Sequence, residues 1–305
     1  MGTFDNNSQF VLSSENKEDN TKYILFGVPD ESGSKGLAQV NGSAGGPDAM
    51  RKASQSYCAF HRTEAGTLKK FITNSYAPIN EDSIPFFDVG DKSKQDVSEI
   101  VASLLENKKF PVILGGDHSI TYEVLKGVNN YHKSFAVVYF DAHPDFRSSD
   151  KANRKSYATV MYDASHLPNL KIKSSIQVGI SDVEPEEFQN AKITGVKQII
   201  PTEIDDMGIQ KTLRLIKKRI GNLPTYISID LDVLDQSFAP AVSTPSPCGL
   251  SSRELLFLLT GLAKENIIGL DIMEHVPTQD GDPSTSRVAA RLIIEFLVRH
   301  YLKGK

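Results

Sequence analysis

The sequence predicts the α/β class, as a single three-layer α/β/α domain built around a parallel sheet of about eight strands. Three observations support this prediction. Short apolar, β-branched runs alternate with helical segments over most of the chain. Several of these runs end directly in His or Asp, as strands do in open α/β sheets that bind ligands at their carboxyl ends. The chain has 305 residues, of which 39% are hydrophobic, which is enough for one sizeable core.

The first half of the chain opens with one strand and one helix. A strand is expected at residues 22–28, and Pro47 stands in the first turn of a helix that opens at 47–52. Regular alternation begins further on, with strands predicted at 85–89, 112–114 and 135–140 and helices at 95–105 and 121–127.

The second half continues the same alternation. Strands are expected at 175–180, 196–200, 225–229 and 267–272, and helices around 213–220, at 251–262 and at 285–301. Glu254 lies three residues after Ser251, which is the spacing of a helix N-terminal capping box. Such a series predicts right-handed crossovers, with helices on both faces of the sheet.

Two segments stand outside this series. Residues 1–20 are rich in Asn, Ser, Glu and Asp, which predicts a flexible N-terminal arm. Residues 57–84 have mixed polarity and no clear period, so the sequence assigns them no structure. There is no sign of an internal repeat or a linker, and residues 21–305 are therefore expected to form one domain.

Composition argues against several classes of function. The net charge of −4 and the pI near 6.0 give no reason to expect a nucleic-acid partner. No apolar run is long enough to cross a bilayer and the N-terminus is polar, so neither a membrane span nor a signal peptide is expected. Two cysteines, Cys58 and Cys248, are too few for a disulfide framework, which favours the cytoplasm.

Candidate metal ligands follow the strand expected at 135–140. Asp141, His143 and Asp145 alternate, so an extended chain would point all three side chains the same way. A polar loop with its charges in water is an equally good interpretation of these three residues alone.

Two other expected strands favour the metal site. The strand at 112–114 runs into Gly-Gly-Asp-His-Ser, which carries His118, and the strand at 225–229 runs into Asp230 and Asp232. Two imidazoles and four carboxylates are too many for one closed zinc site, but they suit a pair of divalent ions. Oxygen ligands with some imidazole favour manganese.

These motifs resemble the signatures of the ureohydrolase family, to which arginase, agmatinase and formimidoylglutamase belong. The matching stretches are Gly-Gly-Asp-His-Ser at 115–119, Asp-Ala-His-Pro-Asp at 141–145 and Ser-Ile-Asp-Leu-Asp-Val-Leu-Asp at 228–235. Their order and spacing match too, and the likeness runs from about Phe26 to the C-terminus. The resemblance implies an arginase-like fold, two Mn²⁺ ions per chain, a small guanidino or amidino substrate and a homo-oligomer, either a trimer or a hexamer.

The resemblance also implies roles for individual residues. Asp141 and Asp230 would bridge the two ions, with His118 and Asp145 completing one coordination sphere and His143 and Asp232 the other. A hydroxide between the ions would attack the central carbon of the substrate. Asp145 would protonate the leaving nitrogen, and Glu274 would hold the planar cationic head of the substrate by paired hydrogen bonds.

The sequence departs from the family pattern at two places. Agmatinases carry a proton-shuttling His in the run that corresponds to 156–161, where this chain has Tyr157. A phenol with a pKa near ~10 is a poor shuttle at neutral pH. The third signature usually continues with Asp-Pro, but here Gln236 follows Asp235. These changes leave the metal ligands intact and put the identity of the substrate in doubt.

Charged residues near the motifs favour two different substrates. Asp182 and Glu184 resemble an acidic loop that would receive the free amine of agmatine. Arg147 and Arg287 would instead anchor a carboxylate, as formimidoylglutamate requires. The first choice is agmatine ureohydrolase activity, giving putrescine and urea. The alternatives are formimidoylglutamase activity, giving glutamate and formamide, and a family member whose catalysis is altered or lost.

Overall fold

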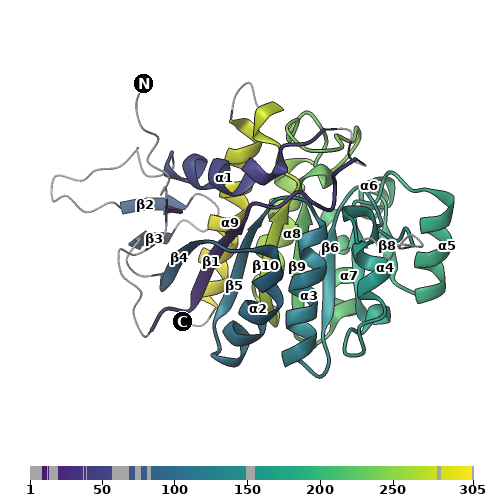
Figure 1. The fold of residues 1–305 in the computed structure, drawn as a ribbon, viewed down its shortest axis with the longest axis horizontal. Coiled ribbons are helices and arrows are strands. Elements are labelled where there is room, and N and C mark those ends of the chain that lie inside the picture. The colour runs from purple at the N-terminus through teal and green to yellow at the C-terminus, as the bar shows by residue number, and fades with distance from the viewer. Residues whose placement is uncertain are drawn as a thin grey trace.

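The computed structural model describes residues 9–11, 13, 20–36, 38, 40–56, 69–72, 77–80, 84–148, 155–279 and 283–303, with the backbone alone for 69–72 and 77–80. The described chain forms a three-layer α/β/α domain around one eight-stranded sheet, in which every pair of neighbouring strands is parallel (Figure 1). The predicted fold class is therefore confirmed.

The strand order of the sheet is β4-β1-β5-β10-β9-β6-β7-β8. The strands are β1 (Tyr23–Val28), β4 (Phe86–Asp91), β5 (Phe110–Gly115), β6 (Ala136–Phe140), β7 (Ile176–Val178), β8 (Lys197–Ile199), β9 (Thr225–Asp230) and β10 (Ile267–Met273). The central strands are buried along nearly their whole length, because helices cover both faces. Each strand lies where the sequence predicts one, with bounds that differ by a few residues.

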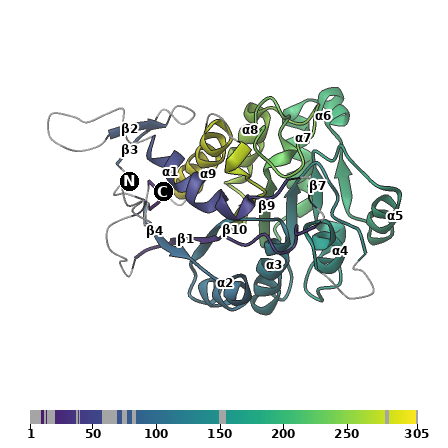
Figure 2. The same ribbon diagram turned by 45° about the horizontal axis from the view of Figure 1, so that its top comes forward.

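Helices cover the two faces unequally. One face packs against α2 (Val97–Glu106), α3 (Ser119–Tyr131), α4 (Val160–Ala164) and α5 (Pro185–Thr194). The other carries α1 (Gly46–Gln55), α6 (Pro201–Met207), α7 (Ile209–Ile220), α8 (Ser252–Leu262) and α9 (Ser284–Leu302). Figure 2 shows these two groups on opposite sides of the strands. Ser251 caps α8 and forms the predicted capping box with Glu254.

Some elements were not predicted from the sequence. The helices α4 and α6 have too few turns to give a readable period, and α5 buries only Glu187 and Ala191, so it has no apolar face to read. Within the segment left unassigned, β2 (Lys69–Ile72) and β3 (Ala77–Asn80) pair as a separate antiparallel sheet, and the remainder lies mostly outside the described residues.

The N-terminal segment touches the domain where it is described. Phe10 is 1% exposed, and its backbone N–H donates to the Asp88 carboxylate at 2.9 Å. Most of residues 1–20 lie outside the described part of the chain, so the flexible arm stays a prediction. Among the described helices, none is both long and apolar enough to cross a membrane.

The strand order explains how the predicted site is assembled. The centre of the sheet is formed by β5, β10, β9 and β6, in that order. In the chain, β6 follows β5 directly, and β9 and β10 come more than eighty residues later. The two later strands are thus inserted between the two earlier ones. All four carboxyl ends therefore open on one crevice, at the point where the strand order reverses.

Candidate metal centre

The four central strands each deliver predicted site residues to the same edge of the sheet. His118 follows β5 at the start of α3, Asp141 follows β6 directly, Asp230 ends β9, and Glu274 follows β10. The turn after β5 requires glycine at residue 116, because a Cβ there would lie 1.9 Å from the carbonyl oxygen of Asp30. This close approach fixes the path by which His118 reaches the crevice.

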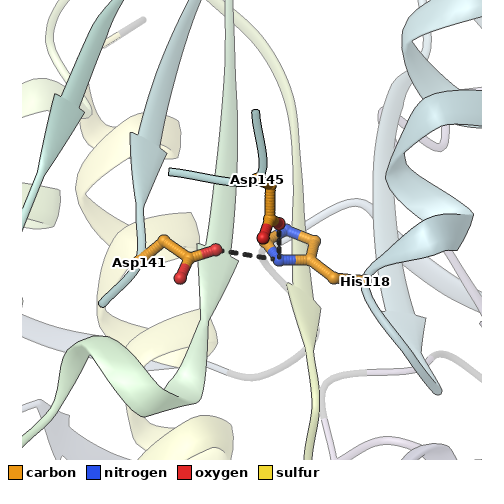
Figure 3. A group of neighbouring side chains, drawn as sticks. All are labelled: His118, Asp141 and Asp145. Carbon is orange, nitrogen blue, oxygen red and sulfur yellow. Dashed lines mark ion pairs between the residues drawn. The ribbon is translucent and has the colours of Figure 1, made fainter. Parts of the chain in front are cut away.

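His118 lies at the centre of the first group of ligand-type atoms. Its Nδ1 is 3.1 Å from Asp141 Oδ2 and 3.1 Å from Asp230 Oδ2. Asp145 Oδ2 lies 3.5 Å from the same nitrogen (Figure 3). His118, Asp141 and Asp145 are all buried, and their ligand atoms lie within 4.8 Å of one another.

The second group shares Asp141 with the first. His143 Nδ1 is 3.0 Å from Asp232 Oδ2 and 3.5 Å from Asp141 Oδ1. Asp141 therefore presents one oxygen to each group, which is the geometry of a bridging carboxylate. The structure thus brings together all six residues predicted as metal ligands.

Backbone N–H groups orient the carboxylates of the cluster. The N–H of His143 donates to Asp141 Oδ1 at 2.6 Å, that of Asp232 to Asp230 Oδ1 at 2.9 Å, and that of Ala142 to Asp232 Oδ1 at 3.1 Å. In Asp230 and Asp232 the hydrogen bond takes Oδ1 and leaves Oδ2 for the crevice, whereas Asp141 Oδ1 accepts its hydrogen bond and also faces the His143 ring. The cluster is therefore held in place by the main chain.

A buried chain of hydroxyl groups fixes the ring of His118. Its Nε2 lies 2.9 Å from Ser228 Oγ, and Ser228 donates its own O–H to Asp271 at 2.7 Å. The hydroxyl group of Ser228 donates its only hydrogen to Asp271. Its oxygen can therefore only accept a hydrogen bond from His118, so Nε2 of His118 carries a hydrogen. Nδ1 is thereby turned toward the carboxylates, where it can carry a proton or, in a neutral ring, offer its lone pair to a cation.

This arrangement fits a bound cation. Three carboxylate oxygens lie 3.1–3.5 Å from Nδ1, so this group of negative charges needs a positive charge among them, either a proton on the ring or a bound cation. Among the described residues, Asp141 Oδ2 is buried and has no hydrogen-bond partner. Hard carboxylate oxygens with imidazole nitrogens suit a divalent ion such as Mn²⁺.

The pKa values reflect the same crowding of charge. Burial raises the pKa of Asp145 well above its usual range, and the neighbouring Asp141 raises it further. Burial lowers the pKa of His118, but the Asp141 and Asp230 carboxylates outweigh it and raise that pKa well above its usual value. Burial likewise raises the pKa of Asp141, and the two imidazoles reverse this and hold it below its usual value.

Asp145 has a second contact that the sequence did not predict. Tyr139, in β6, donates its O–H to Asp145 Oδ2 at 2.5 Å, and its ring stacks on His118 with the centroids 4.7 Å apart. Asp145 also has a φ of 54°, in the left-handed region that non-glycine residues rarely occupy. A tyrosine inside an apolar strand gives no sequence signal for such a contact.

Glu274 lies at the inner wall of the crevice. It is 3% exposed and has a φ of 66°, and one oxygen accepts the backbone N–H of His118 at 2.6 Å. Its other oxygen accepts the O–H of Ser243, a residue that the sequence analysis missed. Burial and then the nearby Asp117 raise the pKa of Glu274 to about 8.

The residues predicted to contact the substrate differ in position. Asp182 is exposed and lies 3.9 Å from His143 Nε2. Arg147 forms an ion pair with Glu184, and both side chains are substantially exposed. Tyr157 is half-buried, and its pKa is raised by burial and then by Glu274 and Asp145, which places it beside the cluster. Arg287 is exposed in the first turn of α9.

The fold and the site together define a three-layer α/β protein with a carboxylate-rich metal centre at the carboxyl edge of its sheet. Residues 21–298 match the model of the arginase family. The chain is 31% identical over 290 residues to an agmatinase from Neisseria meningitidis serogroup C, covering 94% of this chain and 89% of that protein. We conclude that the chain belongs to the arginase family, as the sequence motifs predicted.

Solved structures agree with this assignment. The agmatine ureohydrolase of Thermoplasma volcanium superposes with a TM-score of 0.80 at 27% identity, covering 96% of this chain and 94% of that one. The formimidoylglutamase of Bacillus subtilis superposes with a TM-score of 0.78 at 26% identity, covering 94% of this chain and 89% of that one. Similarity of fold therefore does not separate the two predicted activities, and the residues of the site must do so.

Proposed function

We propose that this arginase-family hydrolase of amidine C–N bonds acts on agmatine and releases urea and putrescine. The observation that carries the proposal is the charge around Arg147. Its guanidinium is paired with Glu184, and the Glu187 carboxylate also acts on it. The cation that would anchor a substrate carboxylate is therefore already neutralised, while the exposed carboxylate of Asp182 faces His143 at 3.9 Å.

We propose that the six-residue cluster holds two Mn²⁺ ions. Asp141 and Asp230 would contact both ions, His118 and Asp145 would complete one set of ligands, and His143 and Asp232 the other. When bound, two divalent ions lower the pKa of the water between them and so supply a nucleophile at neutral pH. The position of Asp141, which is shared by the two groups of ligand atoms, supports this assignment.

Glu274 would bind the planar head of the substrate. The N–H of His118 and the O–H of Ser243 each take one lone pair of its carboxylate, and the lone pairs that remain can accept two N–H groups of a guanidinium. Because Glu274 follows β10, which lies between the strand that leads to His118 and the strand that ends in Asp230, it would hold the central carbon over the cluster.

Asp145 would carry a proton to the leaving nitrogen. As a ligand it would be ionised, and it would take a proton from the attacking nucleophile and pass it to the leaving nitrogen. The O–H of Tyr139 holds Oδ2 in a fixed direction. The distal amine of agmatine would then lie toward Asp182, at the outer rim of the crevice.

The experiment that tests this proposal compares four substrates on one preparation loaded with Mn²⁺. Agmatine, arginine, guanidinobutyrate and formimidoylglutamate are supplied in turn, and urea or formamide release is measured. We expect agmatine to have the highest kcat/KM. A higher value for formimidoylglutamate would favour the carboxylate-anchoring role of Arg147 and Arg287. No turnover of any of the four, with two ions bound, would favour lost or altered catalysis.

We also propose a cytoplasmic location, on the low number of cysteines, and a trimeric or hexameric assembly, on the family resemblance. Light scattering of the purified protein measures its mass in solution and so tests the assembly. A monomer would contradict it. Fractionation of cells that express the protein tests the location.

A further inference from the structure

A buried histidine beside the crevice has no part in the reaction proposed above. His275 follows Glu274 directly and is 0% exposed. Its backbone oxygen lies against the start of α1, where a Cβ on Gly46 would be 3.0 Å away from it. Buried ring nitrogens need hydrogen-bond partners, so the partners of His275 show which parts of the chain it holds together.

Both ring nitrogens of His275 have partners. Nδ1 is 3.0 Å from the backbone oxygen of Ala241, and Nε2 is 2.6 Å from Oγ of Ser286. A carbonyl oxygen can only accept, so Nδ1 carries the hydrogen. In the neutral ring, Nε2 then accepts the O–H of Ser286, which fixes the direction of the ring. His275 thus connects the segment between β9 and α8 with the first turn of α9.

The loop that His275 holds also carries Ser243. The backbone of Ala241 is fixed at both of its polar groups, because its oxygen accepts Nδ1–H of His275 and its N–H donates to Oγ1 of Thr285 at 3.2 Å. Two residues further on, the O–H of Ser243 donates to the carboxylate of Glu274. His275 therefore anchors the loop from which this hydrogen bond to Glu274 is made.

The backbone of Glu274 also depends on its neighbours. Its φ of 66° lies in the left-handed region, which a non-glycine residue keeps only where surrounding contacts hold it. The N–H of Glu274 donates to the carbonyl of Gly116 at 2.8 Å, and the N–H of Val276 donates to that of Ala241 at 2.9 Å. The ring of His275 adds a second hydrogen bond to the carbonyl of Ala241. The strained residue is thus held on both sides.

We propose that His275 positions Glu274 for the planar head of the substrate. By anchoring Ala241, it fixes the loop that carries Ser243 and also the backbone that follows Glu274. Without this anchor the carboxylate would lose its direction, and a small misplacement at a reacting centre is costly. The inference rests on the role proposed above for Glu274. His275 is a positioning residue, because it acts on the substrate only through Glu274.

The experiment compares two variants of the enzyme loaded with Mn²⁺. In His275→Asn the amide nitrogen can replace Nδ1 and donate to Ala241, whereas in His275→Gln the amide takes the place of Nε2, beside Ser286. We expect kcat/KM to fall at least about fivefold in His275→Gln and to stay within about twofold of the parent in His275→Asn, with metal content unchanged. Packing alone predicts the reverse order, because asparagine leaves the larger cavity.

Thr285→Val is a second variant, and it keeps the shape of its side chain. It removes the Oγ1 that accepts the N–H of Ala241, so the loop loses its other anchor, and kcat/KM should fall at least about threefold. Thr212→Val, at a buried threonine of α7, is its matched control and should keep the kinetics of the parent. His300→Gln, at a buried histidine on the amino edge of the sheet, is the corresponding control for His275→Gln.

Glu274→Gln separates this inference from the function on which it rests. Unchanged kinetics in Glu274→Gln would overturn both. If Glu274→Gln is impaired, His275→Gln should add less than about twofold in that background, because both changes act through the same carboxylate. Full additivity, or the order of variants that packing predicts, would overturn this inference alone. So would normal kinetics in His275→Gln or, if that variant does not fold, in Thr285→Val.

Discussion

Two buried histidines at opposite edges of the sheet have opposite pKa shifts, because their surroundings differ. His118, at the carboxyl edge, is 0% exposed and faces three carboxylates, which raise its pKa well above the usual value. His300, at the amino edge, is 8% exposed and packs among the rings of Tyr23, Phe110 and Phe296. Burial, followed by the charges of Lys22 and Lys303, lowers its pKa to about 4.

The two sites differ in the charge that the groups around each imidazole ring favour. Around His300 the ring nitrogen accepts the O–H of Tyr23, so a neutral imidazole completes the packing. Around His118 three carboxylates surround one imidazole, so the cluster calls for more positive charge than the ring alone supplies. Changes at the carboxyl edge should therefore alter ion binding and catalysis, and changes at the amino edge should alter stability.

The largest effect should follow loss of a shared carboxylate. Asp141→Ala removes a ligand from both groups, so we expect loss of both ions and a fall in kcat/KM of at least about a thousandfold. Asp230→Ala should behave in the same way. Elemental analysis of Mn²⁺-loaded protein, together with steady-state kinetics, measures both quantities.

The controls for this prediction are the two imidazoles. His118→Ala and His143→Ala each remove a ligand from one group alone, so each should lose mainly one ion. Circular dichroism verifies that all four variants are folded. Equal loss of both ions in all four would contradict the bridging roles of Asp141 and Asp230.

A smaller loss should follow Glu274→Gln, which keeps the shape of the side chain and removes the negative charge that would pair with a cationic substrate. A charge-assisted pair of this kind contributes about 1.5–3 kcal/mol, so kcat/KM should fall at least roughly tenfold while metal content stays unchanged. Glu123→Gln, on α3 and paired with Lys126, is the control for loss of one negative charge. Unchanged kinetics in Glu274→Gln would contradict the proposed role of Glu274 in substrate binding.

At the amino edge, His300 should make the free energy of unfolding depend on pH. The pKa of His300 is lowered from its usual 6.5 to about 4, so the unfolded chain takes up the proton first as the pH falls. The neutral form of His300 therefore stabilises the folded state fully above about pH 6.5. This contribution is lost progressively as the pH falls toward 4, and the total loss of unfolding free energy is about 2–3 kcal/mol. His300→Gln lacks this titration, so the difference between the unfolding free energies of the parent and the variant should shrink over that range.

Denaturant unfolding at several pH values measures this difference. His166→Gln, at an exposed histidine, is the matched control and should follow the parent at every pH. Parallel curves for the parent and His300→Gln would mean that His300 is not held neutral by its surroundings.

Much of the metal centre could be predicted because its ligands follow apolar strands directly. Asp141, Asp230 and His118 each stand at or just beyond a strand end, and parallel strands align their carboxyl ends. The sequence could not give the strand order, which depends on contacts between β5, β10, β9 and β6. It is this order that brings His118 to 3.1 Å from Asp141 and from Asp230.

The supporting residues could not be predicted, for different reasons. Ser243 is 31 residues before Glu274 in a loop, so only the folded chain shows their hydrogen bond. Tyr139 fits the apolar pattern of its strand, and that pattern gives no indication that its hydroxyl group donates a hydrogen bond to Asp145. Arg147 could be predicted as a charge near the crevice, but its pairing with Glu184 depends on where α5 begins.

The smallest effect at the carboxyl edge should come from Tyr157→Phe. The phenol lies beside the cluster, and burial followed by the carboxylates of Glu274 and Asp145 raises its pKa, which makes it a still poorer proton shuttle at neutral pH. Loss of the hydroxyl should then remove at most one neutral hydrogen bond, and kcat/KM should change by no more than about tenfold. Tyr162→Phe, on α4 beside His166, is the matched control. If Tyr157→Phe is inactive with both ions bound while Glu274→Gln is normal, the phenol takes part in proton transfer and the substrate must bind in the opposite direction.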